Sequence, residues 1–222
     1  MSISTSHAAV EGYESVPAPG PVLAGRPETA MFRRRSLQPS RRAVLHLQAA
    51  GDPAVPSGLG DWFTERAFHF YVAGLRVPGK LTLPGRLPGL GRVRAGSGSV
   101  FADLDSACAY LRDADGIGHV IVTAQGRAAL AAALWSDARS QVPGGGADAL
   151  ILTEPALPSR TSISLNIACP VLVLTSRASA AGRLGSHVTW LQLREPGGQA
   201  VFDELGRWLG AYMYGPGLDR LL

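Results

Sequence analysis

Residues 119–135 of the chain combine a short apolar run, a turn and an alanine-rich segment. Residues 119–123 are mostly β-branched and follow Gly118, a pattern typical of a strand that is buried on both faces. Residues 128–135 consist almost entirely of Ala and Leu, which are strong helix formers. The sequence therefore predicts a buried strand that leads through a sharp turn at 124–127 into a helix.

Similar alternations of apolar runs and helical patterns occupy the rest of the chain. The further expected elements are strands at 28–35, 42–48, 68–75, 148–153, 170–175 and 187–193 and helices at 58–66, 99–113 and 199–214. Strands that alternate with helices imply an α/β fold with a mostly parallel sheet, here of about 7–8 strands, and helices on both faces. A length of 222 residues suits a single domain, which we expect at 13–222 after a flexible segment at 1–12.

A specific family resemblance begins in the 119–135 stretch. Aligned without gaps, this stretch resembles the nucleophile turn of serine aminopeptidase and lysophospholipase-like α/β-hydrolases, which typically reads HVVLMGHSTGGLxAALW. The matching residues are His119, Val120, Leu130, Ala132, Ala133, Leu134 and Trp135. Residues 41–45 and 61–66 are similar to the family's first central strand and helix, and residues 201–211 to its final helix. The resemblance implies an α/β-hydrolase fold for nearly the whole chain.

The catalytic positions of that family are not matched. Gly126 stands where the family has its nucleophilic serine, and alanines replace the flanking glycines. With no serine to hold, we expect the strained turn to be relaxed. The His-Gly pair whose loop helps to form the family's oxyanion hole is replaced by Gln48 and Ala49. The degenerate turn and oxyanion region therefore comprise Gln48, Ala49, Gln125, Gly126 and Arg127.

The acid and the histidine of the triad also have no counterpart. The resemblance places the acid in 176–183, which contains no carboxylate, and the histidine in 194–199, which contains no histidine. His187 begins its strand, at the wrong end of a parallel sheet for a site built at carboxyl ends. We therefore assign no catalytic residue to this chain.

Other reactive side chains are weak candidates. Ser97, Ser99, Ser162 and Ser164 have no predicted histidine nearby, and Thr123 is expected to pack beneath the turn. The histidines at 46, 69 and 119 lie in predicted strands and are more often structural. Glu154 is the one acidic residue just beyond a strand that could face the degenerate site, and a lone carboxylate there is ordinarily solvated.

The connection that carries a cap in the related hydrolases is short here. About sixteen residues separate the strands at 148–153 and 170–175, so we expect no cap domain. Loss of a cap should expose apolar side chains near Leu157, Ile163, Leu165 and Ile167. Large exposed apolar patches tend to mark interaction sites, and we therefore expect a protein partner or self-association near 155–168.

Arg127 follows the vacant nucleophile position, at the start of the predicted helix. Helix amino ends present unpaired backbone amides that attract anions. Arg127 either points away to pair with a surface carboxylate or turns inward, where Gln48 and Gln125 would help it to bind a small anionic ligand.

Composition excludes several function classes. The net charge is +4, but the arginine clusters at 33–35 and 41–42 lack interleaved aromatic residues, so we expect solvated arginines and no nucleic acid. Cys108 and Cys169 have no metal-ligand spacing, and we expect neither a metal nor a cofactor. The sequence shows no signal peptide and no run of about 20 apolar residues, which predicts a cytoplasmic protein without a membrane span.

These observations leave several hypotheses for function. In the first, the chain is a catalytically inactive hydrolase homologue that binds a ligand or a protein partner. In the second, it is a divergent serine-type ester or lipid hydrolase with a rearranged site. In the third, the fold serves only as a scaffold in an assembly.

Overall fold

The computed structural model of the protein describes several separate stretches of the chain. They are residues 12–16, 31–49, 55–56, 58–75, 97–142, 145–156, 165–176, 187–193 and 199–214. Side chains are described throughout except at 97–99 and at 214. The predicted flexible segment 1–12 therefore lies outside the described residues, apart from Gly12.

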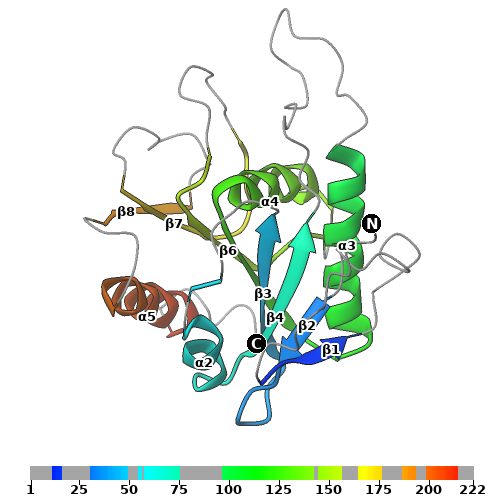
Figure 1. The fold of residues 1–222 in the computed structure, drawn as a ribbon. Coiled ribbons are helices and arrows are strands. Elements are labelled where there is room, and N and C mark those ends of the chain that lie inside the picture. The colour runs from blue at the N-terminus through cyan, green and yellow to red at the C-terminus, as the bar shows by residue number, and fades with distance from the viewer. Residues whose placement is uncertain are drawn as a thin grey trace, which may run out of the picture.

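The described residues form an eight-stranded sheet in the order β1-β2-β4-β3-β5-β6-β7-β8. Its strands are β1 (Glu14–Val16), β2 (Met31–Arg34), β3 (Arg42–Ala49), β4 (His69–Leu75), β5 (His119–Gln125), β6 (Ala149–Thr153), β7 (Val171–Thr175) and β8 (Val188–Gln192). β1 pairs antiparallel with β2 and β2 antiparallel with β4, whereas the remaining pairs are parallel. The carboxyl ends of the parallel strands lie together along one side of the sheet, which we call the carboxyl edge (Figure 1). Their amino ends lie along the opposite side, which we call the amino edge. The predicted mostly parallel sheet is confirmed.

Helices pack on both faces of this sheet (Figure 1). They are α2 (Leu59–Thr64), α3 (Ser97–Asp113), α4 (Gly126–Arg139) and α5 (Gln199–Tyr214). One apolar core lies between the sheet and the pair α3 and α4, and a second lies between the sheet and the pair α2 and α5. Among the described residues, no helix has the length and apolar character that crossing a bilayer requires.

The two-sided covering explains the composition of the central strands. In β5, every residue from Val120 to Ala124 is buried, and β7 is buried along its whole length. Strands covered on both faces favour continuous apolar runs, because neither set of alternating side chains meets water. β8 is an edge strand of the sheet, and its side chains are only partly buried or exposed.

The predicted elements agree with the structure within a few residues, with one omission. β1 was not predicted from the sequence. It has three residues, two of which are exposed, and it exists because Glu14, Ser15 and Val16 pair with β2. Such a short strand has no hydrophobic period of its own, so its sequence carries no strand signal.

A largely buried polar cluster connects the antiparallel strand β2 and its neighbour β4 to the segment after α3. Arg33 in β2 donates two hydrogen bonds of 2.9 Å to the carboxylate of Asp115, which follows α3. Tyr71 in β4 donates a third hydrogen bond of 2.6 Å to the same carboxylate. The side chains of Arg33 and Asp115 are 12% and 17% exposed. Burial, and after it the hydrogen bond to Asp115, raises the pKa of Tyr71 above its usual value, so the hydroxyl remains a donor.

We expect Asp115→Ala to lower the free energy of unfolding by about 3 kcal/mol, because it leaves a largely buried guanidinium with only Glu14, at 2.8 Å, as a carboxylate partner and removes the acceptor of Tyr71. Asp113→Ala is the matched control, since Asp113 is exposed and lies two residues away. That control should change stability by less than about 0.5 kcal/mol. Urea denaturation of the two variants measures the difference. Equal stabilities would show that the Arg33–Asp115–Tyr71 cluster does not support the sheet.

Candidate functional site

The turn between β5 and α4 occupies the place of the expected nucleophile. Gln125 ends β5 with an extended backbone, φ −125° and ψ 152°, and Gly126 begins α4 with φ 59°. A positive φ is sterically costly for a side chain but not for glycine. The backbone therefore keeps a conformation that disfavours side chains, and the strain is relieved, as expected, because glycine adopts this conformation at no steric cost.

Neighbouring strands place polar side chains beside this turn. Leu47 of β3 pairs in register with Ala124 of β5, so Gln48 and Gln125 are the next neighbours at the carboxyl edge. Gln125 also pairs with Thr153 of β6. All three side chains are partly exposed. The structure therefore places Gln48 and Gln125 side by side and adds Thr153 as a neighbour, which the sequence alone did not single out.

The start of α4 is the other part of this edge. Gln125, the residue before α4, makes no capping hydrogen bond with its own side chain, and Gly126 and Arg127 are partly exposed. The carbonyl of Gly126 accepts a hydrogen bond of 3.0 Å from the amide of Ala156, which ties the segment after β6 to the turn. Ala49, the last residue of β3, is 2% exposed and belongs to the core. The set that we call the polar edge is thus Gln48, Gln125, Gly126, Arg127 and Thr153.

Glu154 lies at the carboxyl edge, where the sequence placed it, but β7 engages its carboxylate. The amide of Ser176 donates a hydrogen bond of 2.5 Å to one oxygen, and Thr175 Oγ1 donates one of 3.3 Å to the other. The amide of Glu154 itself donates to the carbonyl of Leu174 at 2.8 Å. These contacts join the ends of β6 and β7, which gives Glu154 a structural role.

The described histidines occupy structural positions. His46 is 3% exposed and stacks on Phe70, with 6.1 Å between ring centroids. Burial lowers the pKa of His46 to about 4, so it is neutral at pH 7. His69 bridges two backbone groups of the β2–β3 loop, and His187 is exposed before β8. Within the described residues, no histidine follows the carboxyl end of a strand.

His119 lies at the amino edge, away from the polar edge. Its Nε2 is 3.1 Å from the hydroxyl of Tyr212, which donates a hydrogen bond of 3.0 Å to the carbonyl of Asp148. Burial lowers the pKa of His119, although the charge of Asp148 opposes this shift. These contacts attach α5 to the beginnings of β5 and β6, so His119 serves the fold.

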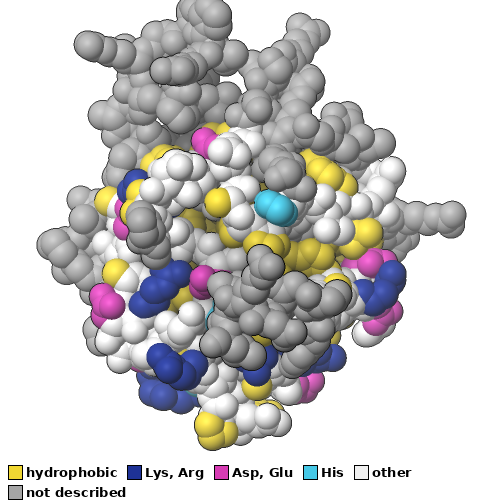
Figure 2. Space-filling view, turned by 180° about the vertical axis from the view of Figure 1, so that it is seen from behind, with side chains coloured by type: hydrophobic (Ala, Val, Ile, Leu, Met, Phe, Trp, Pro, Cys, Tyr) yellow, Lys and Arg dark blue, Asp and Glu magenta, His cyan; other side chains and the backbone are white. Residues whose placement is uncertain are grey.

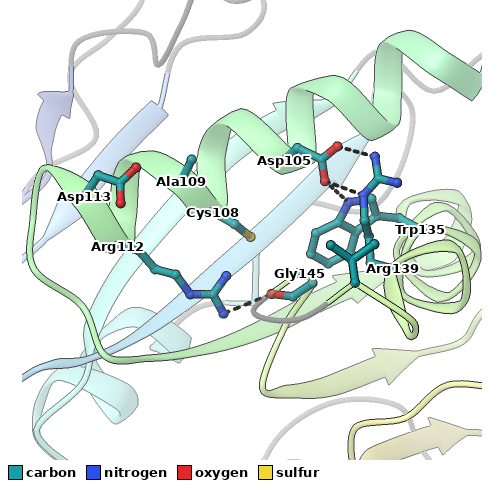
Figure 3. A pocket seen from close by; sticks show the side chains of 10 residues that line it. Asp105, Cys108, Ala109, Arg112, Asp113, Trp135, Arg139 and Gly145 are labelled. Atoms are coloured by element: carbon teal, nitrogen blue, oxygen red, sulfur yellow. Dashed lines mark hydrogen bonds and ion pairs between the residues drawn. The ribbon is translucent and has the colours of Figure 1, made fainter.

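The described residues also form a cavity of about 420 Å³ between α3, α4 and the segment after α4 (Figure 3). Asp105 accepts hydrogen bonds there from Trp135 Nε1, at 2.8 Å, and from Arg139 Nε, at 2.9 Å. Arg112 donates to the carbonyl of Gly146 at 3.0 Å. Burial raises the pKa of the Cys108 thiol to about 12, which makes it a poor nucleophile. The cavity contains no nucleophile with a nearby base.

The prediction that four apolar residues near 155–168 are exposed is wrong for two of them. Leu165 and Ile167 are 6% and 2% exposed and belong to the core beneath α4. They are buried because the chain approaches β7 through this core before the strand begins. Leu157 and Ile163 lie outside the described residues. The described parts of this connection, 154–156 and 165–170, contain no helix.

Several sequence expectations fall outside the described residues. They concern the segments 177–183 and 194–198, where the resemblance places the acid and the histidine, and Ser162 and Ser164. Thr123 is 5% exposed beneath the turn, as expected. Among the described residues, no group of three or more His, Cys, Asp or Glu side chains is arranged to hold a metal ion.

Comparison of the chain with family models and with curated proteins gave no match. Solved structures do match. A carboxylesterase from Mesorhizobium loti has a TM-score of 0.60 and 13% identity, and the match covers 90% of this chain and 99% of that chain. Est1E from Butyrivibrio proteoclasticus has a TM-score of 0.56 and 8% identity, and the match covers 89% of this chain and 97% of that chain. Mouse alpha/beta hydrolase domain-containing protein 10 has a TM-score of 0.54 and 12% identity, and the match covers 90% of this chain and 98% of that chain. With its strand order, this likeness shows that the chain has the α/β-hydrolase fold.

Proposed function

We propose that this protein is a catalytically inactive α/β-hydrolase homologue that binds a ligand at the polar edge. The observation that carries the proposal is Gly126, which occupies the strand-to-helix turn with φ 59°. The fold holds a nucleophile at this turn so that its side-chain oxygen projects from the end of the sheet. Glycine has no side chain to project. The turn therefore keeps its backbone conformation but carries no nucleophile.

Loss of the remaining catalytic groups supports the same proposal. Gln48 and Ala49 replace the His-Gly pair at the end of β3, and the carboxylate of Glu154 is bound to the end of β7. A hydroxyl without a positioned base is a weak nucleophile. Hydrolysis, which the names of the similar esterases suggest, would require a serine and a base at positions that the resemblance does not indicate.

A small anion, such as a carboxylate or a phosphate, is the ligand class that suits the polar edge. Gln48 and Gln125 carry amide donors on adjacent strands, and α4 begins directly after Gln125. The amino end of a helix and a guanidinium both favour a negative charge, and a planar guanidinium can donate two parallel hydrogen bonds to a carboxylate or a phosphate. Arg127, in the first turn of α4, would supply that guanidinium.

Protein binding near 155–168 is the other form that the binding role could take. Burial of Leu165 and Ile167 removes part of the apolar surface that this form requires. The anion is therefore the better supported ligand.

We expect Gly126→Ser to hydrolyse p-nitrophenyl butyrate no faster than the unaltered protein, because no histidine of the described residues lies at the carboxyl edge to accept the serine proton. Removal of triad members typically costs several powers of ten, so a serine alone should stay near background. Gly126→Ala is the control for folding, since both variants place a side chain at a positive φ and should lose about 1–2 kcal/mol of stability. Turnover by the serine variant, and not by the alanine variant, would reveal a base and overturn the proposal.

We expect citrate or phosphate at saturating concentration to raise the Tm by about 5 °C at constant ionic strength. Arg127→Ala should abolish this rise, because it removes the guanidinium that meets the anion. Arg207→Ala is the matched control, since Arg207 is an α5 side chain with 71% exposure. A rise that persists in the Arg127 variant, or that disappears equally in both variants, would contradict an anion site at the polar edge.

A further inference from the structure

The loop between β2 and β3 lies at the amino edge of the sheet (Figure 1). It carries one exposed apolar side chain on a backbone that is held by hydrogen bonds. Leu37 is 79% exposed. The amide of Ser36 donates to His69 Nδ1 at 3.2 Å, and His69 Nε2 donates to the carbonyl of Ser40 at 3.1 Å. The amide of Leu37 itself donates to the carbonyl of Thr64 at 3.4 Å. The loop is therefore held on both sides of its apolar tip.

Such exposure is unusual within this protein. Among the described residues, only Leu37 and Val142 are large hydrophobic side chains that are exposed, and Val142 is 48% exposed. A single exposed leucine needs no functional explanation by itself. The surroundings of Leu37 provide the second observation.

The loop that carries this tip, and the segment to which it is hydrogen-bonded, are rich in arginine. The surface formed by residues 35–42 and 65–68, which we call the amino-edge surface, contains Arg35, Arg41, Arg42 and Arg66 and one carboxylate, Glu65. In the face shown in Figure 2, arginine side chains gather over the lower part, where an apolar surface also projects.

The charges on this surface are only partly neutralised. Arg35 pairs with Glu14, and Arg66 lies 3.9 Å from Glu65. Arg41 Nε donates to the carbonyl of Gly116, and Arg42 lies over the ring of Phe68 at 5.5 Å. Neither Arg41 nor Arg42 has a carboxylate within 4.0 Å among the described residues. Two arginines beside the apolar tip thus keep an excess positive charge.

We propose that the amino-edge surface binds the surface of an anionic phospholipid bilayer. Leu37 enters the boundary between headgroups and acyl chains, and the arginines meet the headgroup phosphates. Peripheral binding of this kind scales with buried apolar area and with attraction between basic side chains and anionic lipids. An apolar tip on a held loop favours a bilayer over a nucleic acid, because a phosphate backbone offers leucine no apolar contact.

The amino-edge surface is separate from the polar edge. It lies at the amino ends of the parallel strands, whereas Gly126 lies beyond their carboxyl ends. Lipid binding therefore does not depend on the proposed anion site, and failure of either proposal leaves the other standing.

Co-sedimentation with vesicles of phosphatidylcholine and phosphatidylserine, in a 7:3 ratio at about 0.1 M salt, tests the proposal. We expect binding to these vesicles, much weaker binding to phosphatidylcholine alone, and loss of binding at about 0.5 M salt. Leu37→Ser should weaken the partition coefficient by about tenfold. The double variant Arg41→Gln, Arg42→Gln should weaken it by about twenty-five-fold, from roughly fivefold per arginine.

Two control variants distinguish binding through this surface from nonspecific binding to vesicles. Val142→Ser removes the other exposed apolar side chain, and Arg207→Gln removes an arginine that is 71% exposed. Neither should change the partition coefficient by more than about twofold, which is what the loss of one weak, distant contact would cause. An unchanged Tm in the Leu37 variant confirms that its effect is local.

Several results would overturn the proposal. They are equal binding to neutral and anionic vesicles, and equal losses in the Leu37 and Val142 variants. Binding of an acidic protein or a nucleic acid through the same arginines, without vesicle binding, would also assign the surface to a different partner and reject the lipid.

Discussion

The packing of α4 on the centre of the sheet is the constraint on which the rest of the structure depends. Residues 128–136 of this helix are all buried, and the helix contacts β3, β5 and β6. Its alanines allow the helix to approach the strands closely, and Trp135 at 0% exposure joins it to α3 through Asp105. Because both the end of β5 and the start of α4 are fixed, the chain must reverse within one residue. Gly126 satisfies that geometry with a positive φ.

Because this packing fixes the turn, the α/β-hydrolase fold of this chain does not depend on a catalytic side chain there. Strand order, the helix pairs on each face and the strand-to-helix turn all persist without a side chain at the turn. Ionisable groups of the kind that catalyse hydrolysis have structural contacts here: Glu154 joins β6 to β7, His119 supports α5, and His46 is buried against Phe70. The exposed polar groups at the turn are amides and a guanidinium, which suit binding better than bond cleavage.

Much of the fold could be predicted because its signals are local. The apolar run of β5 and the alanines of α4 identify a two-sided strand and a buried helix, and the α5 bounds follow from its pattern. Features that depend on distant contacts could not be predicted. Burial of Leu165 and Ile167 is decided by the core under α4, and β1 exists through its pairing with β2. The positive φ of Gly126 reflects fixed neighbours, and the α3–α4 cavity needs both helices in place.

The central claim is that no serine of this chain acts as a hydrolytic nucleophile. Intact-mass spectrometry of the unaltered protein after incubation with a fluorophosphonate tests it most directly, because this reagent modifies only serines that a base activates. We expect no change in the mass of this protein when an active serine esterase is modified completely in the same mixture. A stoichiometric adduct on one serine, lost when that serine is replaced by alanine, would contradict it.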